Sequence, residues 1–345
     1  MNKQKALVIC PGRGTYNQTE LGYLKTYHSD KKEFLNKIDT FRKMSDQLTI
    51  SEIDGMDKFK PSVHTKGENA ASLIYACAYA DYLSINQDKY DICAVTGNSM
   101  GWYLALACGG ALNVAGSYEL INTMGSMMKD GLIGGQIIYP ITNDDWTENI
   151  ELAQDVLGII SKVNEQNDCE AYISINFGGY LVIGGNEKAL KELMTALPPA
   201  QERFPMKLTG NGAFHTPLFN EISVKAKRMI PENIFEKPKA TLIDGRGQIW
   251  HPLMSETSKL YDYTLGHQVV ETYDFTKAVM IGVKEFAPDK IILLGPATVL
   301  GGAIAQILIE CRWLGLKNKQ EFVNLQKENP FLLSMGNPDQ RKLVL

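Results

Sequence analysis

Short apolar runs that end in glycine or proline alternate with longer, breaker-free segments in the first third of the chain. Residues 5–10 and 92–96 are such runs, and each leads directly into a glycine-containing turn, which is typical of buried strands. Residues 70–83 are rich in Ala, Leu and Tyr, and residues 102–108 are apolar, so both segments are predicted helices. Strands that alternate with helices predict a mainly parallel α/β sheet.

The pattern changes between residues 136 and 208. Apolar and amphipathic segments here follow the order strand, helix, strand, strand, helix, strand, which is the βαββαβ pattern of ferredoxin-like folds. The strands are expected at 136–141, 171–176, 180–185 and 203–208, and the helices at 144–163 and 187–197.

The strand pattern of the large sheet resumes after this unit. Residues 240–243 and 290–294 are predicted strands, and the second is followed by a glycine-rich helix start. We therefore predict a large α/β domain made of residues 1–135 and 209–345, with residues 136–208 inserted as a small subdomain. The C-terminal stretch is polar and then contains proline, so it predicts a terminal helix and a tail.

Composition and charge narrow the function classes. The 345-residue chain has a formal net charge of −4, and its lysines and arginines are scattered, so it lacks the basic patch of a nucleic-acid-binding protein. The N-terminal apolar run is too short for a signal peptide or a membrane span, so we expect a cytoplasmic protein that binds no membrane. The six cysteines form no CxxC pair and the five histidines no HExxH motif, so we expect reduced thiols and no metal site.

Ser99 lies at the centre of the pentapeptide GNSMG, between a predicted strand and a predicted helix. Two glycines in this context permit a sharp turn that exposes the serine hydroxyl, while the helix N-terminus offers free N–H groups to an oxyanion. The pentapeptide therefore predicts a nucleophilic serine. A second interpretation stays open, because serine is a favoured N-cap and Ser99 could cap the helix that begins at Trp102.

A serine nucleophile needs a base, and each of the five histidines is a candidate. His215 lies in the short-residue loop GAFHTP, from which its side chain can point into a cleft. The other four histidines lie in more polar or breaker-rich segments, which is typical of surface residues. The residues alone favour His215 narrowly. The other candidates are His28, His64, His251 and His267.

Five short motifs follow one another along the chain: PGRG, GNSMG, SINFGGYLVIGG, GAFHTPLF and LLGPATVL. Together they resemble the acyltransferase family that moves malonyl groups from coenzyme A to acyl carrier protein. The similarity extends from Ala6 to Leu308. It implies an α/β-hydrolase-like large domain with an inserted ferredoxin-like subdomain, in agreement with the βαββαβ order.

The resemblance places a catalytic dyad on Ser99 and His215. The family orients its histidine with a main-chain carbonyl, and the segment QVVETYDFTKAV gives this role to Gln268, which explains why no triad carboxylate is evident. The family's oxyanion hole uses two backbone N–H groups, which correspond to Arg13 and Met100. Side-chain changes at these two positions need not abolish main-chain roles.

Five residues correspond to substrate-binding positions of the family. Asn69 takes the place of a glutamine upstream of the serine. Phe214, directly before the histidine, resembles the AFH pattern of polyketide acyltransferases that take units without a methyl branch, where its ring would narrow the pocket. A core aromatic is the alternative for Phe214. The five residues are Arg13, Asn69, Met124, Asn176 and Phe214.

The acyl group is left open by departures from the family pattern. Malonyl enzymes carry an arginine where this chain has Met124, and a buried carboxylate without a partner is costly, so Met124 alone predicts acetyl or another small neutral acyl group. Arg13, which replaces a glutamine, could instead reach a malonyl carboxylate from its loop. It could equally face coenzyme A phosphates or pair with Glu68. A third departure is Asn98, where the family usually has histidine.

Ping-pong acyl transfer is the first functional interpretation. An acyl-CoA would acylate the serine, and the phosphopantetheine thiol of an acyl carrier protein would then take the acyl group, in fatty-acid or polyketide biosynthesis. This chemistry needs no cofactor beyond the coenzyme A thioester and the carrier's own group. We expect the chain to act as a monomer.

Two other interpretations come from different classes. A serine thioesterase or esterase would place its acid between Ser99 and His215, but the inserted unit occupies that segment with Asp144, Asp145 and Asp155. A carrier-protein-docking homologue without transfer activity is suggested by the departures from the family pattern.

Overall fold

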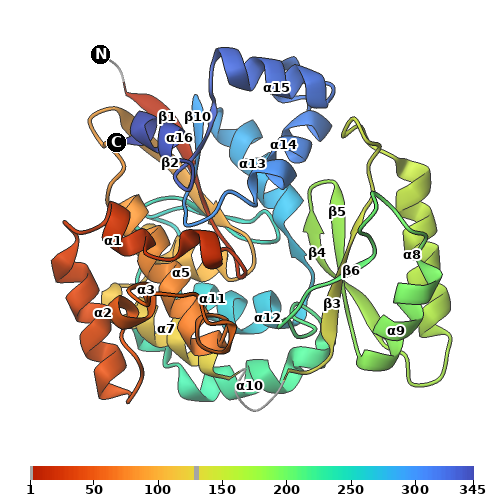
Figure 1. Ribbon diagram of the computed structural model, residues 1–345, viewed down its shortest axis with the longest axis horizontal. Coiled ribbons are helices and arrows are strands. Elements are labelled where there is room, and N and C mark those ends of the chain that lie inside the picture. The colour runs from red at the N-terminus through yellow and green to blue at the C-terminus, as the bar shows by residue number, and fades with distance from the viewer. Residues whose placement is uncertain (1–2, 128–131) are drawn as a thin grey trace.

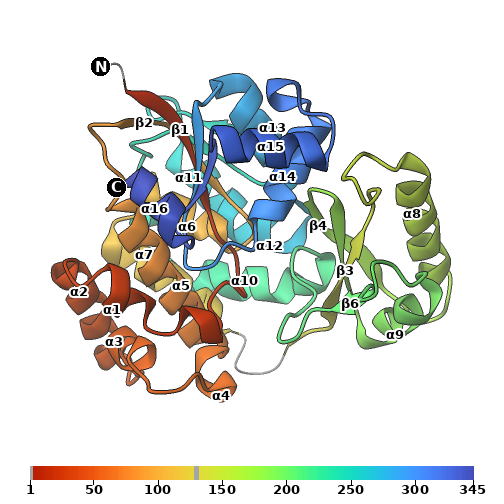
Figure 2. The ribbon, with the colours of Figure 1, turned by 45° about the horizontal axis from the view of Figure 1, so that its top comes forward.

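The computed structural model describes residues 3–127 and 132–345. Within these ranges two β-sheets lie side by side, each with its own helices (Figure 1). The smaller sheet, with the yellow-green helices beside it, stands to one side of the larger part in both ribbon views (Figure 2). Both chain ends lie together on the far side of the larger part.

The larger sheet contains six strands of the described residues, in the order β11-β10-β1-β2-β7-β8. Neighbouring strands are parallel except β7 and β8. Val8 of β1 pairs with Val95 of β2 on one side and with Ile292 of β10 on the other. The predicted α/β fold class with a mainly parallel sheet is confirmed. The strands are β1 (Gln4–Cys10), β2 (Tyr90–Gly97), β7 (Leu242–Ile243), β8 (Ile249–Trp250), β10 (Lys290–Leu293) and β11 (Leu332–Ser334).

Helices cover both faces of this sheet, which is why β1 reads as a continuous apolar run. Successive side chains of a strand point to opposite faces. Leu7 packs against Gly282 of α13 (Phe275–Phe286), whereas the sulfur of Cys10 lies 4.0 Å from that of Cys108 at the end of α6 (Gly101–Cys108). Both faces of β1 are therefore buried.

The smaller sheet has the strand order β6-β3-β5-β4-β9 in the described residues. Its first four strands are antiparallel and have the order of a ferredoxin-like sheet, with a separate core that includes Ile137, Ile160 and Leu193. The fifth strand, β9 (Tyr273–Asp274), comes from outside the predicted insertion and pairs parallel with β4. The other elements are β3 (Gly135–Pro140), α8 (Ile150–Asn164), β4 (Ala171–Phe177), β5 (Tyr180–Gly185), α9 (Glu187–Ala196) and β6 (Met206–Lys207).

Most predicted elements occur close to their expected bounds, but the C-terminal prediction is wrong in part. The expected tail contains β11, which pairs parallel with β10, and a last helix, α16 (Pro338–Val344). Arg341 of α16 is buried and its Nη1 donates to Asp81 Oδ1 at 2.5 Å. The tail thus completes the large sheet and is anchored to the core by a buried ion pair.

No helix among the described residues is long and apolar enough to cross a membrane. The remaining helices are α1 (Tyr23–Tyr27), α2 (Lys32–Met44), α3 (Ile50–Asp54), α4 (Pro61–His64), α5 (Gly67–Tyr82), α7 (Val114–Ser126), α10 (Asn220–Met229), α11 (Thr257–Asp262), the π-helical turn η4 (Tyr263–His267), α12 (Gln268–Val270), α14 (Gly301–Glu310) and α15 (Lys319–Glu328), with short 3-10 turns η1 (Gln18–Glu20), η2 (Pro217–Phe219), η3 (Glu232–Ile234) and η5 (Trp313–Gly315).

Candidate active site

Ser99 lies in a sharp turn between β2 and α6. Its φ angle is +56°, in the left-handed region that residues other than glycine rarely adopt. The turn depends on its glycines, because a Cβ on Gly97 would lie 2.2 Å from the carbonyl oxygen of Gly101. Helix α6 begins at Gly101 with Met100 as its cap residue and no side-chain capping hydrogen bond. The N-cap interpretation of Ser99 is therefore wrong, and the turn has the geometry of a nucleophile elbow.

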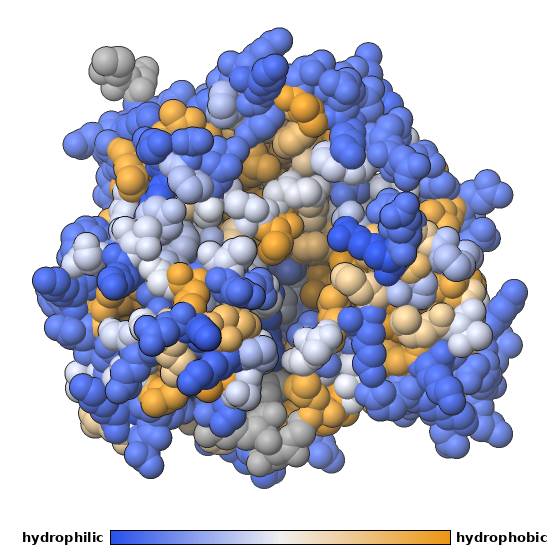
Figure 3. All heavy atoms as spheres, viewed as in Figure 1, coloured by the Kyte–Doolittle hydropathy of each residue, from blue (hydrophilic) through white to orange (hydrophobic). Residues whose placement is uncertain are grey.

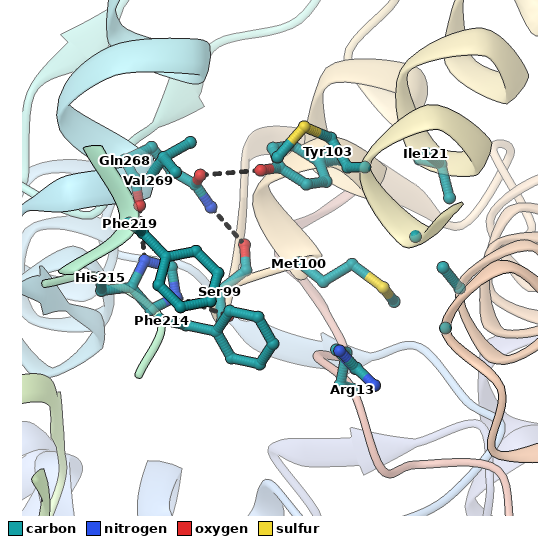
Figure 4. A pocket seen from close by; sticks show the side chains of 14 residues that line it. Arg13, Ser99, Met100, Tyr103, Ile121, Phe214, His215, Phe219, Gln268 and Val269 are labelled. Carbon is teal, nitrogen blue, oxygen red and sulfur yellow. Dashed lines mark hydrogen bonds between the residues drawn. The ribbon is translucent and has the colours of Figure 1, made fainter. Parts of the chain in front are cut away.

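His215 faces the serine across the site. Its Nε2 lies 2.7 Å from Ser99 Oγ, and its Nδ1 lies 2.5 Å from the main-chain oxygen of Gln268 (Figure 4). A carbonyl can only accept, so Nδ1 carries the proton and Nε2 accepts from the serine hydroxyl. The main-chain N–H of His215 donates to the carbonyl of Val269 at 3.1 Å. The structure thus brings together the three residues predicted as base, nucleophile and orienting carbonyl.

Helix termini explain why no carboxylate is needed beside this histidine. Gln268 and Val269 lie in α12, the last segment of a helical run that starts with α11 and continues through η4. The last carbonyls of a helix lack partners within the helix and form the negative end of its dipole. The Gln268 carbonyl accepts from the ring of His215 and the Val269 carbonyl from its main chain, so the helix end orients the residue and favours the positive charge that the ring gains when it takes a proton.

Burial sets the protonation state of the base. His215 is 4% exposed, and loss of solvation lowers its pKa from 6.5 to about 4, although the Gln268 carbonyl opposes this change. The imidazole is therefore neutral near pH 7, which is the state that can accept the serine proton.

The expected surface positions of the other histidines are wrong for two of them. His28 and His64 are fully buried. His28 Nε2 lies 2.8 Å from Asp81 Oδ1, in the network around the C-terminal helix, and His64 Nε2 lies 3.0 Å from the carbonyl oxygen of Ile53. Both have structural partners away from Ser99.

Two backbone N–H groups predicted for the oxyanion hole lie where the PGRG loop meets the elbow. The Asn98 N–H donates to the Cys10 carbonyl at 3.2 Å. A Cβ on Gly12 would lie 2.7 Å from the Asn98 carbonyl oxygen, so only glycine permits this approach. In the part of the chain that the structure describes, the N–H groups of Arg13 and Met100 have no hydrogen-bond acceptor. Both are available to a developing oxyanion.

The dyad opens into a small, mostly apolar cavity of about 60 Å³. One water-sized group occupies roughly 10–15 Å³ on such a measure, so the cavity holds only a few heavy atoms. The face of the molecule in Figure 3 is hollowed between the larger part and the small subdomain. The walls come from the loop after β1, the elbow, α5, α6, α7, η2, α12 and the loop around His215, and they include Arg13, Met100, Tyr103, Ile121, Met124, Phe214, Phe219 and Val269.

The chain resembles known proteins in structure but not in sequence. No protein-family model and no curated protein matches the chain. Among solved structures, it resembles a malonyl-CoA:acyl carrier protein transacylase from Xanthomonas oryzae pv. oryzae, with a TM-score of 0.75 over 100% of this chain and 98% of that one, at 16% identity. An acyl-carrier-protein S-malonyltransferase from Burkholderia pseudomallei gives a TM-score of 0.74 at 17% identity, covering 98% of each chain.

A third structure, a malonyl-CoA:ACP transacylase from Synechocystis sp., matches over 99% of each chain with a TM-score of 0.72 and 14% identity. The chain has the malonyl-CoA:ACP transacylase fold. At identities of 14–17%, this likeness is one of fold.

Arg13 contributes the charged group on the cavity wall of this transacylase fold. Its guanidinium donates to the carbonyl of Gly210 at 3.3 Å and lies 5.3 Å from the centre of the Phe214 ring. Loss of solvation lowers the pKa of Arg13. These contacts place the guanidinium on the wall of the cavity beside Ser99. Met124 and Phe214 line the same cavity.

Asn69 is not brought to the cavity, contrary to the expected substrate-binding role. It lies on α5 between Gly67 and Ala71, which do line the cavity, and a helix turns by about 200° over two residues. Its side chain is buried on the other side, where it accepts from Arg42 Nη2 at 2.5 Å and donates to the Val63 carbonyl at 2.9 Å. Asn69 thus joins α5 to α2 and α4.

Asn176 also lies away from the dyad. It lines a separate cavity of about 340 Å³ beside the small subdomain, together with Glu310. Its Nδ2 donates to Asp274 Oδ2 at 3.0 Å, across the parallel pair that β4 forms with β9. The expected substrate-binding role of Asn176 is not supported, because its side chain is used to join the two parts of the chain.

Tyr103 and the Gln268 side chain were missed by the sequence reasoning. Tyr103 lies in the first turn of α6, directly after the elbow, and its position near Ser99 in the sequence was the signal available. Its hydroxyl donates to Gln268 Oε1 at 2.9 Å. The partnership with Gln268 spans 165 positions and has no local signal.

Proposed function

We propose that the chain is an acyl-CoA:acyl-carrier-protein S-acyltransferase of the malonyl-CoA transacylase type. The observation that carries this proposal is the dyad: Ser99 Oγ lies 2.7 Å from His215 Nε2, whose other nitrogen is held by a main-chain carbonyl, in a chain with the transacylase fold. The structures with this fold are described as transacylases that act on malonyl-CoA and acyl carrier protein.

The first half-reaction forms an acyl-serine. His215 Nε2 takes the proton of the Ser99 hydroxyl while Oγ attacks the thioester carbonyl carbon. The carbonyl oxygen becomes negative and accepts from the N–H groups of Arg13 and Met100. When the tetrahedral intermediate collapses, the C–S bond breaks and the coenzyme A sulfur takes the proton from His215.

The second half-reaction runs the same steps in reverse with a different thiol. His215, neutral again, accepts the proton of a carrier protein's phosphopantetheine thiol, whose sulfur attacks the acyl-serine. The C–O bond breaks and Ser99 regains its proton. The transfer is therefore ping-pong, needs no resident cofactor, and is proposed for a cytoplasmic monomer whose partner is acyl carrier protein.

We propose malonyl as the acyl group, with Arg13 as the partner of its free carboxylate. Arg13 supports this choice because it places a half-buried cation on the wall of a small cavity whose other walls are largely apolar. Met124 supports the second candidate, a neutral group such as acetyl, because it puts a thioether where the family has its arginine.

Transfer rates for malonyl-CoA and acetyl-CoA decide between these groups. For malonyl, Arg13→Ala should slow transfer by roughly 10- to 150-fold, the equivalent of about 1.5–3 kcal/mol for a charge-assisted hydrogen bond, with little change for acetyl. The matched control is Arg203→Ala, which removes another guanidinium over a phenyl ring, 4.8 Å from Phe204, in the small subdomain. If acetyl is the preferred group instead, Met124→Arg should recruit malonyl. A malonyl preference that Arg13→Ala leaves unchanged would contradict the assignment.

The fate of the acyl group tests the function itself. The protein is incubated with radiolabelled malonyl-CoA or acetyl-CoA, half of each sample is offered phosphopantetheinylated carrier protein, and all samples are then separated by denaturing electrophoresis. Label that remains on the chain without carrier protein, and that appears on the carrier when it is added, supports the transferase. Rapid release as free acid would indicate a thioesterase, and absence of label from both acyl-CoAs would indicate a docking homologue.

A further inference from the structure

The identity of residue 268 is not explained by its contact with His215, because that contact uses the main-chain oxygen, which every residue has. The Gln268 side chain is 2% exposed, and both ends of its amide have partners. Its Nε2 donates to the Ser99 carbonyl at 3.2 Å, and its Oε1 accepts from the Tyr103 hydroxyl at 2.9 Å (Figure 4). The orientation of the amide follows from chemistry, because the Ser99 carbonyl can only accept.

The carbonyl that Gln268 contacts belongs to the peptide group that ends in the Met100 N–H. A peptide group is planar, so fixing its C=O also fixes the direction of its N–H. The Trp102 N–H donates to the same Ser99 oxygen at 2.9 Å. Two donors therefore hold the carbonyl, while the N–H on the other side of the peptide group has no acceptor among the described residues.

We propose that Tyr103 and Gln268 are positioning residues that orient and polarise the Ser99–Met100 peptide group as an oxyanion-hole donor. The chain of hydrogen bonds runs from the Tyr103 hydroxyl through the Gln268 amide to the Ser99 carbonyl, and its last N–H is that of Met100. Linked hydrogen bonds polarise one another in a site of low dielectric constant. This inference rests on the proposed function, because it takes Ser99 as the acylated nucleophile.

The same residue also couples the two halves of the dyad. The main chain of Gln268 holds the His215 ring, and its side chain holds the Ser99 main chain. Tyr103 is buried, and burial raises the pKa of its hydroxyl. The hydroxyl therefore keeps its proton at neutral pH and can donate it to Gln268. In Figure 4 dashed lines join the Gln268 amide to Tyr103 and to Ser99, and His215 lies beside the serine.

Single-turnover acylation by malonyl-CoA tests the proposal in wild type, Tyr103→Phe, Gln268→Met and the double variant. Loss of one such hydrogen bond should slow acylation roughly tenfold without a change in the affinity for malonyl-CoA. Because each variant leaves a buried polar group unpaired, the thermal midpoint should fall by about as much as in Tyr139→Phe, which loses a comparable bond. The double variant should be no slower than Gln268→Met, because both changes break one chain. Tyr139→Phe is the control, since it removes a 2.9 Å hydroxyl–carbonyl bond to Pro198 in the small subdomain, and it should acylate at the wild-type rate.

A pH profile of Gln268→Glu separates positioning from packing. An ionised carboxylate at this position would face the Ser99 carbonyl and repel it, whereas a protonated one can donate to it. Burial raises the pKa of such a carboxyl group. The acylation rate of this variant should therefore rise as the pH falls from 8 to 6, a range in which wild type should be flat.

The possible failures are distinguishable. If wild type forms an acyl-enzyme but Tyr103→Phe and Gln268→Met acylate at its rate, the positioning role is wrong and the proposed function stands. Slower acylation that is matched by an equal loss of malonyl-CoA affinity and by a larger fall in thermal midpoint than that of Tyr139→Phe would also overturn the positioning role. If wild type forms no acyl-enzyme, the proposed function and this inference fall together.

Discussion

The rate of Ser99 acylation should be almost independent of pH from 7 down to 5. Burial lowers the pKa of His215 from 6.5 to about 4, which corresponds to about 3 kcal/mol against the imidazolium. At pH 5 a base with that pKa is about 90% neutral, so acylation should keep about nine tenths of its rate at pH 7. A solvated histidine with a pKa near 6.5 would instead lose roughly 25-fold over the same range.

The assay is single-turnover transfer of radiolabel from malonyl-CoA to the protein, quenched at several times and repeated between pH 4 and 8. The control is the free energy of unfolding at each pH, because a histidine that is buried in its neutral form destabilises the folded state in acid. The unfolded chain binds a proton at His215 below pH 6.5 and the folded chain only near pH 4, so stability falls as the pH drops through this window, by about 2 kcal/mol at pH 5. Unfolding titrations at each pH establish that the protein is folded. A 25-fold loss of acylation in folded protein at pH 5 would refute the buried base.

Two further predictions concern the loop contact beside Ser99 and the ion pair that anchors the C-terminal helix. Gly12→Ala should push the PGRG loop away from the elbow, because its Cβ would lie 2.7 Å from the Asn98 carbonyl oxygen. We expect acylation to fall at least tenfold with an unchanged circular dichroism spectrum. A normal acylation rate would contradict the contact between loop and elbow. Arg341→Leu should lower the free energy of unfolding by about 3–5 kcal/mol in urea titrations, because it leaves Asp81 buried without its cation; a change below about 1 kcal/mol would show that the pair is not a stabilising anchor.

The sequence predicts what local pattern and chain order determine. The elbow at Ser99 could be predicted because a strand, two glycines and a helix lie within a few residues of one another, and the βαββαβ unit because its six elements follow in order. The orienting carbonyl of Gln268 was predicted from the family resemblance, since a main-chain role leaves no side-chain signal of its own.

The rest depends on contacts between distant segments. Strand β9 joins the small sheet from far along the chain, and Asn176 is turned to Asp274 by that pairing instead of facing the dyad. Asn69 was assigned by alignment with a glutamine, but helical rotation and a partner on α2 place it outside the cavity. The hydroxyl of Tyr103 meets Gln268 only after folding, so their shared role appears in the structure alone.

Peptide mapping by mass spectrometry tests the central claim most directly. Wild-type protein is mixed with malonyl-CoA, quenched in acid, digested and analysed beside Ser99→Ala. We predict one acyl adduct, on the peptide that contains Ser99, absent from Ser99→Ala and at least a hundredfold slower to form in His215→Ala. An adduct on another residue, or undiminished labelling of Ser99→Ala, would show that the dyad seen in the structure is not the site of acyl transfer.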